Sequence, residues 1–204
     1  MQLFLVRHGE TDSNRSGLAL GRADVPLNDA GLLQARCLGQ TLSGEPIAAV
    51  YASPLRRATD TAREIAATHG LEVQVDEGLI EMDIGQAEGL TFTELRERFP
   101  ELLHNWAGPD GPAFLMPGGE RLVDVQERAW ATVQSLAKRH QDDAVCAVTH
   151  NFVILSVLAA ALGVDLANFR RLRHSLAAIA VIDFRPDRTR VLRMNDTCHL
   201  DSEH

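Results

Sequence analysis

Short, continuous apolar runs recur along the chain. Their length and continuity are typical of strands that are buried on both faces of a sheet. The runs occupy residues 3–6, 47–52, 144–148, 177–184 and 189–194, and a shorter strand is predicted at 73–75. The last two long runs are separated by Arg185, Pro186 and Asp187, whose residue types favour a turn, so we expect an antiparallel pair.

Helical patterns fill the intervals between these strands. Residues 29–43 follow Asn28, a preferred N-cap residue, and carry apolar side chains at helical spacing. Ser53 and Pro54 have the residue types of an N-cap and a first-turn proline, which predicts a helix from there to about Gly70. Further helices are predicted at residues 91–99 and 120–139, and a very apolar one is predicted after Asn151 that ends at Gly163.

Strands that alternate with helices predict an α/β fold. The expected architecture is a three-layer α/β/α sandwich with a mainly parallel central sheet and an antiparallel edge. The length of 204 residues fits one domain. Residues 77–119 contain Gly, Pro and short helical pieces, so we interpret them as a lid-like insertion within a single domain of residues 1–204.

Composition argues against several classes of protein. Lys and Arg number 20 and Asp and Glu number 28, which gives a net charge of −8 and disfavours a general nucleic-acid-binding protein. The longest apolar run, at residues 152–162, is too short to span a bilayer, so we expect no membrane partner and a cytoplasmic location. Cys37, Cys146 and Cys198 are widely spaced and odd in number, which favours neither a disulfide framework nor a zinc site. We interpret Cys37 and Cys146 as small buried side chains.

Three predicted strand-to-helix junctions carry cationic or titratable side chains. These are Arg7 and His8 after the first strand, Arg56 and Arg57 after the second, and His150 after a later one. The carboxyl ends of parallel strands meet at one edge of the sheet, where helix N-termini also present backbone N–H groups. Two histidines and several arginines at that edge predict a site for a phosphate dianion.

Five segments carry a resemblance to a known family. They are residues 5–11 (LVRHGET) with Asn14, 53–58 (SPLRRA) with Thr61 and Ala62, 81–85 (EMDIG) with Glu88 and Gly89, 117–120 (PGGE), and 148–151 (VTHN). Together they resemble the motifs of the histidine phosphatase superfamily, the phosphoglycerate mutase-like enzymes, in its phosphatase branch. Residues 195–200 (NDTCHL) are similar to the tail of alpha-ribazole phosphatase-like members. The resemblance covers nearly the whole chain and implies the phosphoglycerate mutase-like fold.

The resemblance implies a phosphate cradle and a nucleophile. The implied phosphate-binding residues are Arg7, His8, Asn14, Arg57, His150 and Asn151. His8 is the implied nucleophile, which attacks phosphorus and forms a phosphohistidine. The two arginines and His150 also belong to the implied catalytic set, because they offset negative charge on the phosphoryl group in the transition state. A proton donor completes the set.

Glu81 is the implied proton donor to the leaving group, with Asp83 and Glu88 as alternatives. No metal and no other cofactor is implied, because the cations of the site are side chains. Two positions depart from the family pattern: Ala87 lies where many members carry a large aromatic residue, and Asn151 lies where many carry glycine. We therefore expect the substrate-side wall to differ.

The remaining histidines are interpreted as surface residues. They are His69, His104, His140, His174, His199 and His204. For His104 and His174, a place near the mouth of the site is the alternative.

The implied activity is that of a metal-independent phosphomonoesterase, acting on a small phosphorylated metabolite through a phosphohistidine on His8. Two alternatives stand beside it: a cofactor-dependent phosphoglycerate mutase, and a non-catalytic module that binds a phosphorylated ligand on the same fold. The expected partner is a small phosphate ester; the oligomeric state stays open, with a homodimer as one option. Residues 91–114 and 171–175 are expected to select the substrate, which the sequence does not identify.

Overall fold

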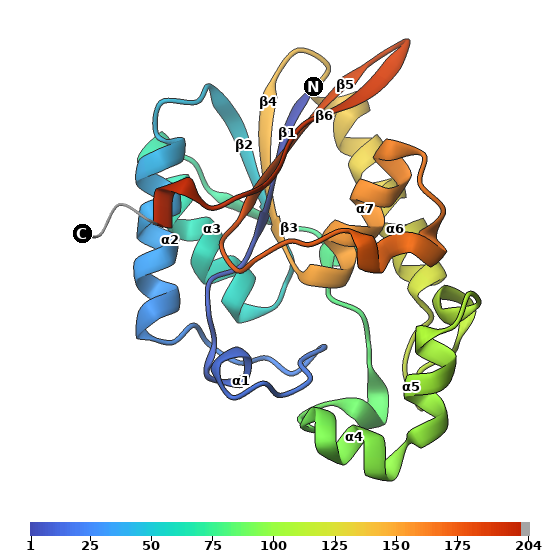
Figure 1. Ribbon diagram of the computed structural model, residues 1–204. Coiled ribbons are helices and arrows are strands. Elements are labelled where there is room, and N and C mark those ends of the chain that lie inside the picture. The colour runs from blue at the N-terminus through green and yellow to red at the C-terminus, as the bar shows by residue number, and fades with distance from the viewer. Residues whose placement is uncertain (201–204) are drawn as a thin grey trace.

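A six-stranded sheet forms the middle layer of the protein (Figure 1), and the computed structural model describes residues 1–200. The strands are β1 (Gln2–Arg7), β2 (Ile47–Ala52), β3 (Val73–Val75), β4 (Ala144–Thr149), β5 (Ile179–Arg185) and β6 (Arg188–Asp196). They lie in the order β3-β2-β4-β1-β5-β6. Neighbours among β1–β4 pair in parallel, whereas β5 is antiparallel to both β1 and β6. The predicted mainly parallel sheet with an antiparallel edge is confirmed.

Helices cover both faces of this sheet. They are α1 (Asp12–Arg15), α2 (Asp29–Leu42), α3 (Arg56–His69), α4 (Phe92–Arg98), α5 (Pro100–Ala107), α6 (Leu122–Arg139) and α7 (Asn151–Leu162). One face packs against α2 and α3 and the other against α6 and α7, which gives three layers (Figure 1). The predicted α/β/α sandwich is therefore confirmed.

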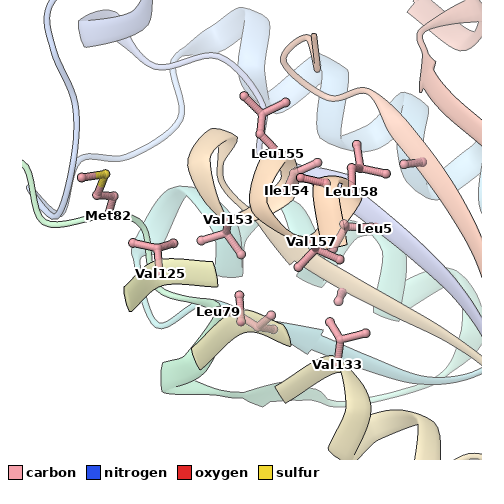
Figure 2. Close-up of a cluster of buried hydrophobic side chains, with 14 of the residues drawn as sticks. Leu5, Leu79, Met82, Val125, Val133, Val153, Ile154, Leu155, Val157 and Leu158 are labelled. Carbon is pink, nitrogen blue, oxygen red and sulfur yellow. The ribbon is translucent and has the colours of Figure 1, made fainter. Parts of the chain in front are cut away.

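Alternation along β1 supplies apolar side chains to both layers. Leu5 belongs to the cluster on the α6–α7 side and Val6 to the cluster on the α2–α3 side, and neither is exposed. Figure 2 shows the first cluster, in which Leu5 lies with Val133 of α6 and Val157 of α7. Burial of each such side chain stabilises the fold by roughly 1.5–3 kcal/mol. The packed core on both faces therefore fixes the position of the carboxyl end of β1.

Helix α3 begins later than the sequence predicts. It starts at Arg56, with Leu55 in the N-cap position, rather than at Ser53. The N–H of Arg56 donates to the carboxylate of Asp24 at 2.6 Å, so a side chain from a distant loop satisfies this helix end. Ser53 is fully buried and its hydroxyl is used in another contact.

Other boundaries agree with the sequence within a few residues. Asn28 caps α2 by accepting the N–H of Gly31, and Gly163 ends α7 in the left-handed conformation. Helix α6 begins at Leu122 rather than at residue 120. The four-residue helix α1 is not predicted, because its signal is the local capping box between Thr11 and Asn14 rather than an apolar stripe.

Helices α4 and α5 project beyond the carboxyl ends of the strands (Figure 1). Thr91 and Glu94 form a capping box at the start of α4, and Pro100 occupies the first turn of α5. Both helices fall within the predicted insertion of residues 77–119, whose action as a lid stays a prediction.

Two further expectations can be compared with the structure. Cys146 is buried as predicted, but Cys37 is only half-buried, so the interpretation of Cys37 as a buried side chain is wrong. Its helix α2 lies on the outer layer, where one side faces solvent.

Within residues 1–200, no helix is long and apolar enough to cross a lipid bilayer. His204 and the end of the predicted domain lie outside the described residues.

Candidate active site

The carboxyl ends of β1, β2 and β4 bring the predicted site residues together. Arg7 ends β1 and His8 follows it, His150 follows β4, and Arg57 lies in the first turn of α3 after β2. The ring centroids of His8 and His150 are 5.1 Å apart. The charges of Arg7 and Arg57 act on both imidazoles. The structure therefore brings these four side chains together, and their roles in binding and catalysis stay predictions.

His8 is almost completely buried and its backbone is held from both sides. Its N–H donates to the carbonyl oxygen of Thr149 in β4, and its own carbonyl accepts the N–H of Ala177, both at 3.1 Å. Nδ1 lies 2.7 Å from the carbonyl oxygen of Gly9, which can only accept, so Nδ1 carries the proton. Burial, and then the two neighbouring arginines, hold the pKa of His8 well below its ordinary value. A neutral imidazole with a lone pair on Nε2 is the form that a nucleophile requires.

The loop that follows His8 rests directly on α2 and α3. A Cβ atom on Gly9 would lie 2.5 Å from the carbonyl oxygen of Gly31 in α2, so no side chain fits there. The N–H of Gly9 donates to Oγ1 of Thr61 at 3.1 Å, and that hydroxyl donates to the carbonyl of Arg57. The backbone around His8 is thereby tied to the helix that carries Arg57.

Arg57 is fully buried, and two carbonyl groups fix its guanidinium. Nη1 donates to Ala23 at 2.7 Å and Nη2 donates to Gly21 at 2.6 Å. Glu88 holds the same loop, because its two carboxylate oxygens accept the N–H groups of Gly21 and Ala23. Burial lowers the pKa of Arg57.

Arg7 contacts a histidine that the sequence analysis assigns to the surface. Its Nη1 donates to the carbonyl oxygen of His174 at 2.6 Å. His174 is only 2% exposed, so its assignment to the surface is wrong. Its Nε2 bonds to the carbonyl oxygen of Ala178 at 3.0 Å inside the protein. Burial lowers the pKa of His174 to about 4 and that of Arg7 to about 10. His104, by contrast, is exposed.

His150 is fully buried and bonds to Ser53. Its Nε2 lies 2.6 Å from the hydroxyl oxygen of Ser53, at the end of β2. Burial is the largest cause that holds the pKa of His150 well below its ordinary value, and the charge of Arg57 is the next. His150 is therefore neutral near pH 7.

Three buried polar nitrogens of the site have no hydrogen-bond partner within residues 1–200. They are Nε of Arg7, Nε of Arg57 and Nδ1 of His150. Buried donors are nearly always satisfied in folded proteins, so unpaired ones call for an explanation. Three nitrogens on three neighbouring residues are explained by a ligand that accepts hydrogen bonds and carries negative charge.

Glu81 lies beside this group of nitrogens and is 3% exposed. Its two carboxylate oxygens accept the N–H groups of Met82 at 2.8 Å and Phe152 at 3.3 Å. Burial raises the pKa of Glu81, although the hydrogen bonds and the charges of Arg57 and Arg7 act in the opposite direction. A carboxyl group with a raised pKa can hold a proton near neutral pH and release it to a leaving group.

The two alternative carboxylates have other partners. Asp83 is half-exposed and accepts the N–H of Gly85 at 2.9 Å. Glu88 uses both of its oxygens on the loop that holds Arg57. Burial next to both arginines therefore favours Glu81 as the acid of the site.

Arg128 of α6 supports the segment that carries Glu81, and sequence reasoning missed it. Its guanidinium donates to the carbonyl oxygens of Gly78, Ile80 and Glu81 at 3.0, 2.6 and 3.2 Å, and pairs with Glu120. The available signal is a charged residue directly beside the apolar stripe of a long helix. Ser53 also carried a signal, because it follows a strand whose neighbours end in site residues.

The two predicted asparagines take part differently. Oδ1 of Asn14 accepts hydrogen bonds from the backbone and the hydroxyl of Thr11 in a capping box, which leaves its amide nitrogen as the donor. Asn151 is half-buried at the first position of α7, next to His150. Contact of either residue with phosphate stays a prediction.

Within residues 1–200, no three His, Cys, Asp or Glu side chains are grouped as metal ligands.

Comparison with known proteins adds a family to this geometry. The model of the histidine phosphatase superfamily (branch 1) matches residues 3–197. The chain is 36% identical over 201 residues to phosphoserine phosphatase 1 of Hydrogenobacter thermophilus, and the match covers 98% of this chain and 94% of that protein.

Solved structures agree with this similarity. Bacillus stearothermophilus YhfR matches with a TM-score of 0.92 and 31% identity, over 98% of this chain and 99% of that chain. A phosphoserine phosphatase mutant from Entamoeba histolytica in complex with phosphoserine matches with a TM-score of 0.89 and 26% identity, over 98% of each chain. Both the sequence and the fold are thus shared along nearly the whole chain.

Proposed function

Since the chain belongs to branch 1 of the histidine phosphatase superfamily and is a phosphoric monoester hydrolase, we propose that it acts through a phosphohistidine on His8. The observation that carries this proposal is the state of His8. Its Nδ1 proton is engaged by the carbonyl of Gly9, its pKa is lowered, and it faces a cluster of unpaired nitrogens. A nucleophile and an anion site are therefore adjacent.

In the first step, Nε2 of His8 attacks phosphorus while the bond from phosphorus to the ester oxygen breaks. Arg7, Arg57 and His150 hold the non-bridging oxygens and offset their charge in the transition state. Glu81 gives its proton to the leaving oxygen, so the alcohol departs neutral. The product of this step is phosphohistidine with a Glu81 carboxylate.

In the second step, Glu81 accepts a proton from a water molecule as that water attacks the phosphohistidine. The bond from phosphorus to Nε2 breaks, inorganic phosphate leaves, and His8 and Glu81 return to their starting states. The positive charges are supplied by guanidinium groups, so the cycle runs without a metal.

For the substrate, we propose a small phosphorylated hydroxy acid, with L-phosphoserine as the first compound to test. The support is similarity to phosphoserine phosphatase 1 of Hydrogenobacter thermophilus and to the phosphoserine complex of the Entamoeba histolytica protein. Helices α4 and α5, which project beyond the strand ends, are in a position to contact the rest of such a molecule (Figure 1).

The test is release of inorganic phosphate from L-phosphoserine, 3-phosphoglycerate, a ribazole-type nucleotide and p-nitrophenyl phosphate, with the His8→Ala variant as control. We expect turnover that a chelator leaves unchanged and vanadate inhibits, because vanadate mimics five-coordinate phosphorus. An alkaline quench should trap phosphate on His8.

Three results would contradict parts of this proposal. Substantial activity in His8→Ala excludes a nucleophilic His8. Conversion of 3-phosphoglycerate to its isomer without phosphate release, in the presence of a bisphosphoglycerate primer, identifies a mutase. Phosphate binding without turnover of any ester identifies a non-catalytic module.

A further inference from the structure

Ser53 lies between β2 and α3, and its buried hydroxyl contacts both the start of α3 and His150. Its N–H donates to the carbonyl oxygen of Val148 in β4 at 3.0 Å, which places the side chain beside the end of that strand. The hydroxyl oxygen accepts the N–H of Leu55 at 3.3 Å and lies 2.6 Å from Nε2 of His150. The 2.6 Å contact is short, and both of its partners are fully buried.

Counting protons indicates the direction of this contact once an anion is bound beside His150. If Nε2 of His150 carried a proton, the oxygen of Ser53 would accept from both Nε2 and Leu55, and its own proton would have no acceptor within the described residues. An unsatisfied buried donor costs about 1–3 kcal/mol. If Nε2 is unprotonated, the hydroxyl donates to it and both atoms of the contact are satisfied, and the one donor left over is Nδ1–H, which a bound anion can satisfy. The proton of a neutral His150 then resides on Nδ1.

We propose that Ser53 is a positioning residue that fixes the tautomer of His150, so that a neutral imidazole points an N–H group at the bound phosphoryl group. The proposal rests on the proposed function for the identity of the anion. Its second support is Nδ1 of His150, which is buried without a partner in the described part of the chain. That nitrogen is available to donate a hydrogen bond to a bound anion.

The tautomer matters because charge does not supply the attraction. The pKa of His150 is held well below its ordinary value, so the ring is neutral at the pH of catalysis. With the proton on Nδ1, the ring donates to a phosphoryl oxygen; with the proton on Nε2, a lone pair would face that oxygen and repel it. His8 has the same tautomer but presents its other end, the lone pair of Nε2.

The experiment compares Ser53→Ala with Ser156→Ala. Ser156 of α7 is an equally buried serine whose hydroxyl has no partner within residues 1–200, so it is a matched control. The ring nitrogens of His150 are observed by NMR in labelled protein, and affinity for inorganic phosphate and vanadate is measured by titration. We expect a protonated Nδ1 on His150 in the wild type. Ser53→Ala should shift the proton toward Nε2 and weaken phosphate binding by about tenfold or more, the loss of one charge-assisted hydrogen bond.

The control and the conservative variant should behave differently. Ser156→Ala should leave both readouts unchanged, and Ser53→Thr, which keeps the hydroxyl, should restore the tautomer. A wild-type His150 protonated on Nε2 overturns the proposal without any variant. So does a folded Ser53→Ala that keeps both the tautomer and the phosphate affinity.

Neither readout requires turnover, so the two proposals can fail separately. A protein that hydrolyses no ester, but binds phosphate with these tautomers, refutes the hydrolytic mechanism and leaves the role of Ser53 intact.

Discussion

Replacement of Arg128 by Met tests how Glu81, the proposed proton donor, is held. Arg128 is in α6, outside the phosphate cradle, yet it donates to three carbonyl oxygens in the segment that ends at Glu81. Its remaining hydrogen bonds go to Glu120, through Nε and Nη2. A methionine fills much of the same space and makes none of these bonds.

The magnitude follows from those contacts. Hydrogen bonds to a charged group contribute about 1.5–3 kcal/mol each, but the side chain of Arg128 is 22% exposed, so water replaces part of the loss. We therefore expect the free energy of unfolding to fall by about 3–5 kcal/mol. Displacement of the Glu81 carboxyl by about 1 Å should cost roughly 10²-fold in rate wherever the leaving group needs a proton.

The assay compares kcat/KM for an alkyl phosphate, such as phosphoserine, with that for p-nitrophenyl phosphate. Nitrophenolate leaves without a proton, so its ester should lose only a few-fold in rate. Arg121→Met is the control, because Arg121 makes an exposed ion pair with Asp124 near the start of the same helix. That solvent-exposed pair contributes little to stability, and the rates for both substrates should be unaffected.

Two outcomes would refute the reasoning. An equal loss for both esters would mean that Arg128 supports the phosphate cradle rather than the acid. Unchanged kinetics together with unchanged stability would mean that the three carbonyl contacts are not made in solution. Temperatures are chosen so that every variant remains folded during the assay.

Three further predictions concern the acid, a buried histidine and a glycine contact. Glu81→Gln should slow alkyl esters far more than p-nitrophenyl phosphate, and in the wild type kcat/KM for alkyl esters should decrease as the pH rises through the raised pKa of Glu81; an equal loss for both esters would assign the acid to another residue. His174 has a folded-state pKa of about 4 against 6.5 when unfolded, so the unfolded chain binds the proton more tightly. The free energy of unfolding should therefore be unaffected by this group above pH 6.5 and fall by up to about 3 kcal/mol toward pH 4. Urea melts of His174→Gln should lack this part of the decrease if the imidazole is its source. Gly9→Ala would place a methyl group 2.5 Å from the carbonyl oxygen of Gly31 and should cost about 1–3 kcal/mol, whereas Gly44→Ala, with open space around it, should change thermal stability by less than about 0.5 kcal/mol; similar melting temperatures for the two variants would contradict the close packing.

Apolar patterning was sufficient for the sheet and the main helices. The runs at residues 47–52 and 144–148 match β2 and β4 to within a residue, because strands that are buried on both faces consist of continuous apolar residues. The start of α3 could not be found in this way. Asp24, which caps it, is 32 residues away in the sequence, and only the tertiary fold brings it there.

The residues of the candidate site that follow strands could be predicted from the sequence. The residues that hold them in place through backbone contacts could not. Arg7, His8 and His150 each follow a predicted strand, so their convergence follows from parallel topology. His174 accepts from Arg7 through its own backbone carbonyl, and Arg128 donates to backbone carbonyls of another segment. A contact made to a carbonyl group leaves no residue-specific trace in the partner's sequence, so side-chain patterns could not reveal it.

Two carboxylates outside the projecting helices, Glu88 and Glu120, each hold one side of the site. Glu88 fixes the loop that holds Arg57, while Glu120 pairs with the guanidinium that supports Glu81. Both carboxylates lie outside residues 91–114, so this stretch makes none of the hydrogen bonds that hold Arg57 and the Glu81 segment. We therefore expect exchange of this stretch to change which alcohol is accepted more than it changes the transfer of the phosphoryl group.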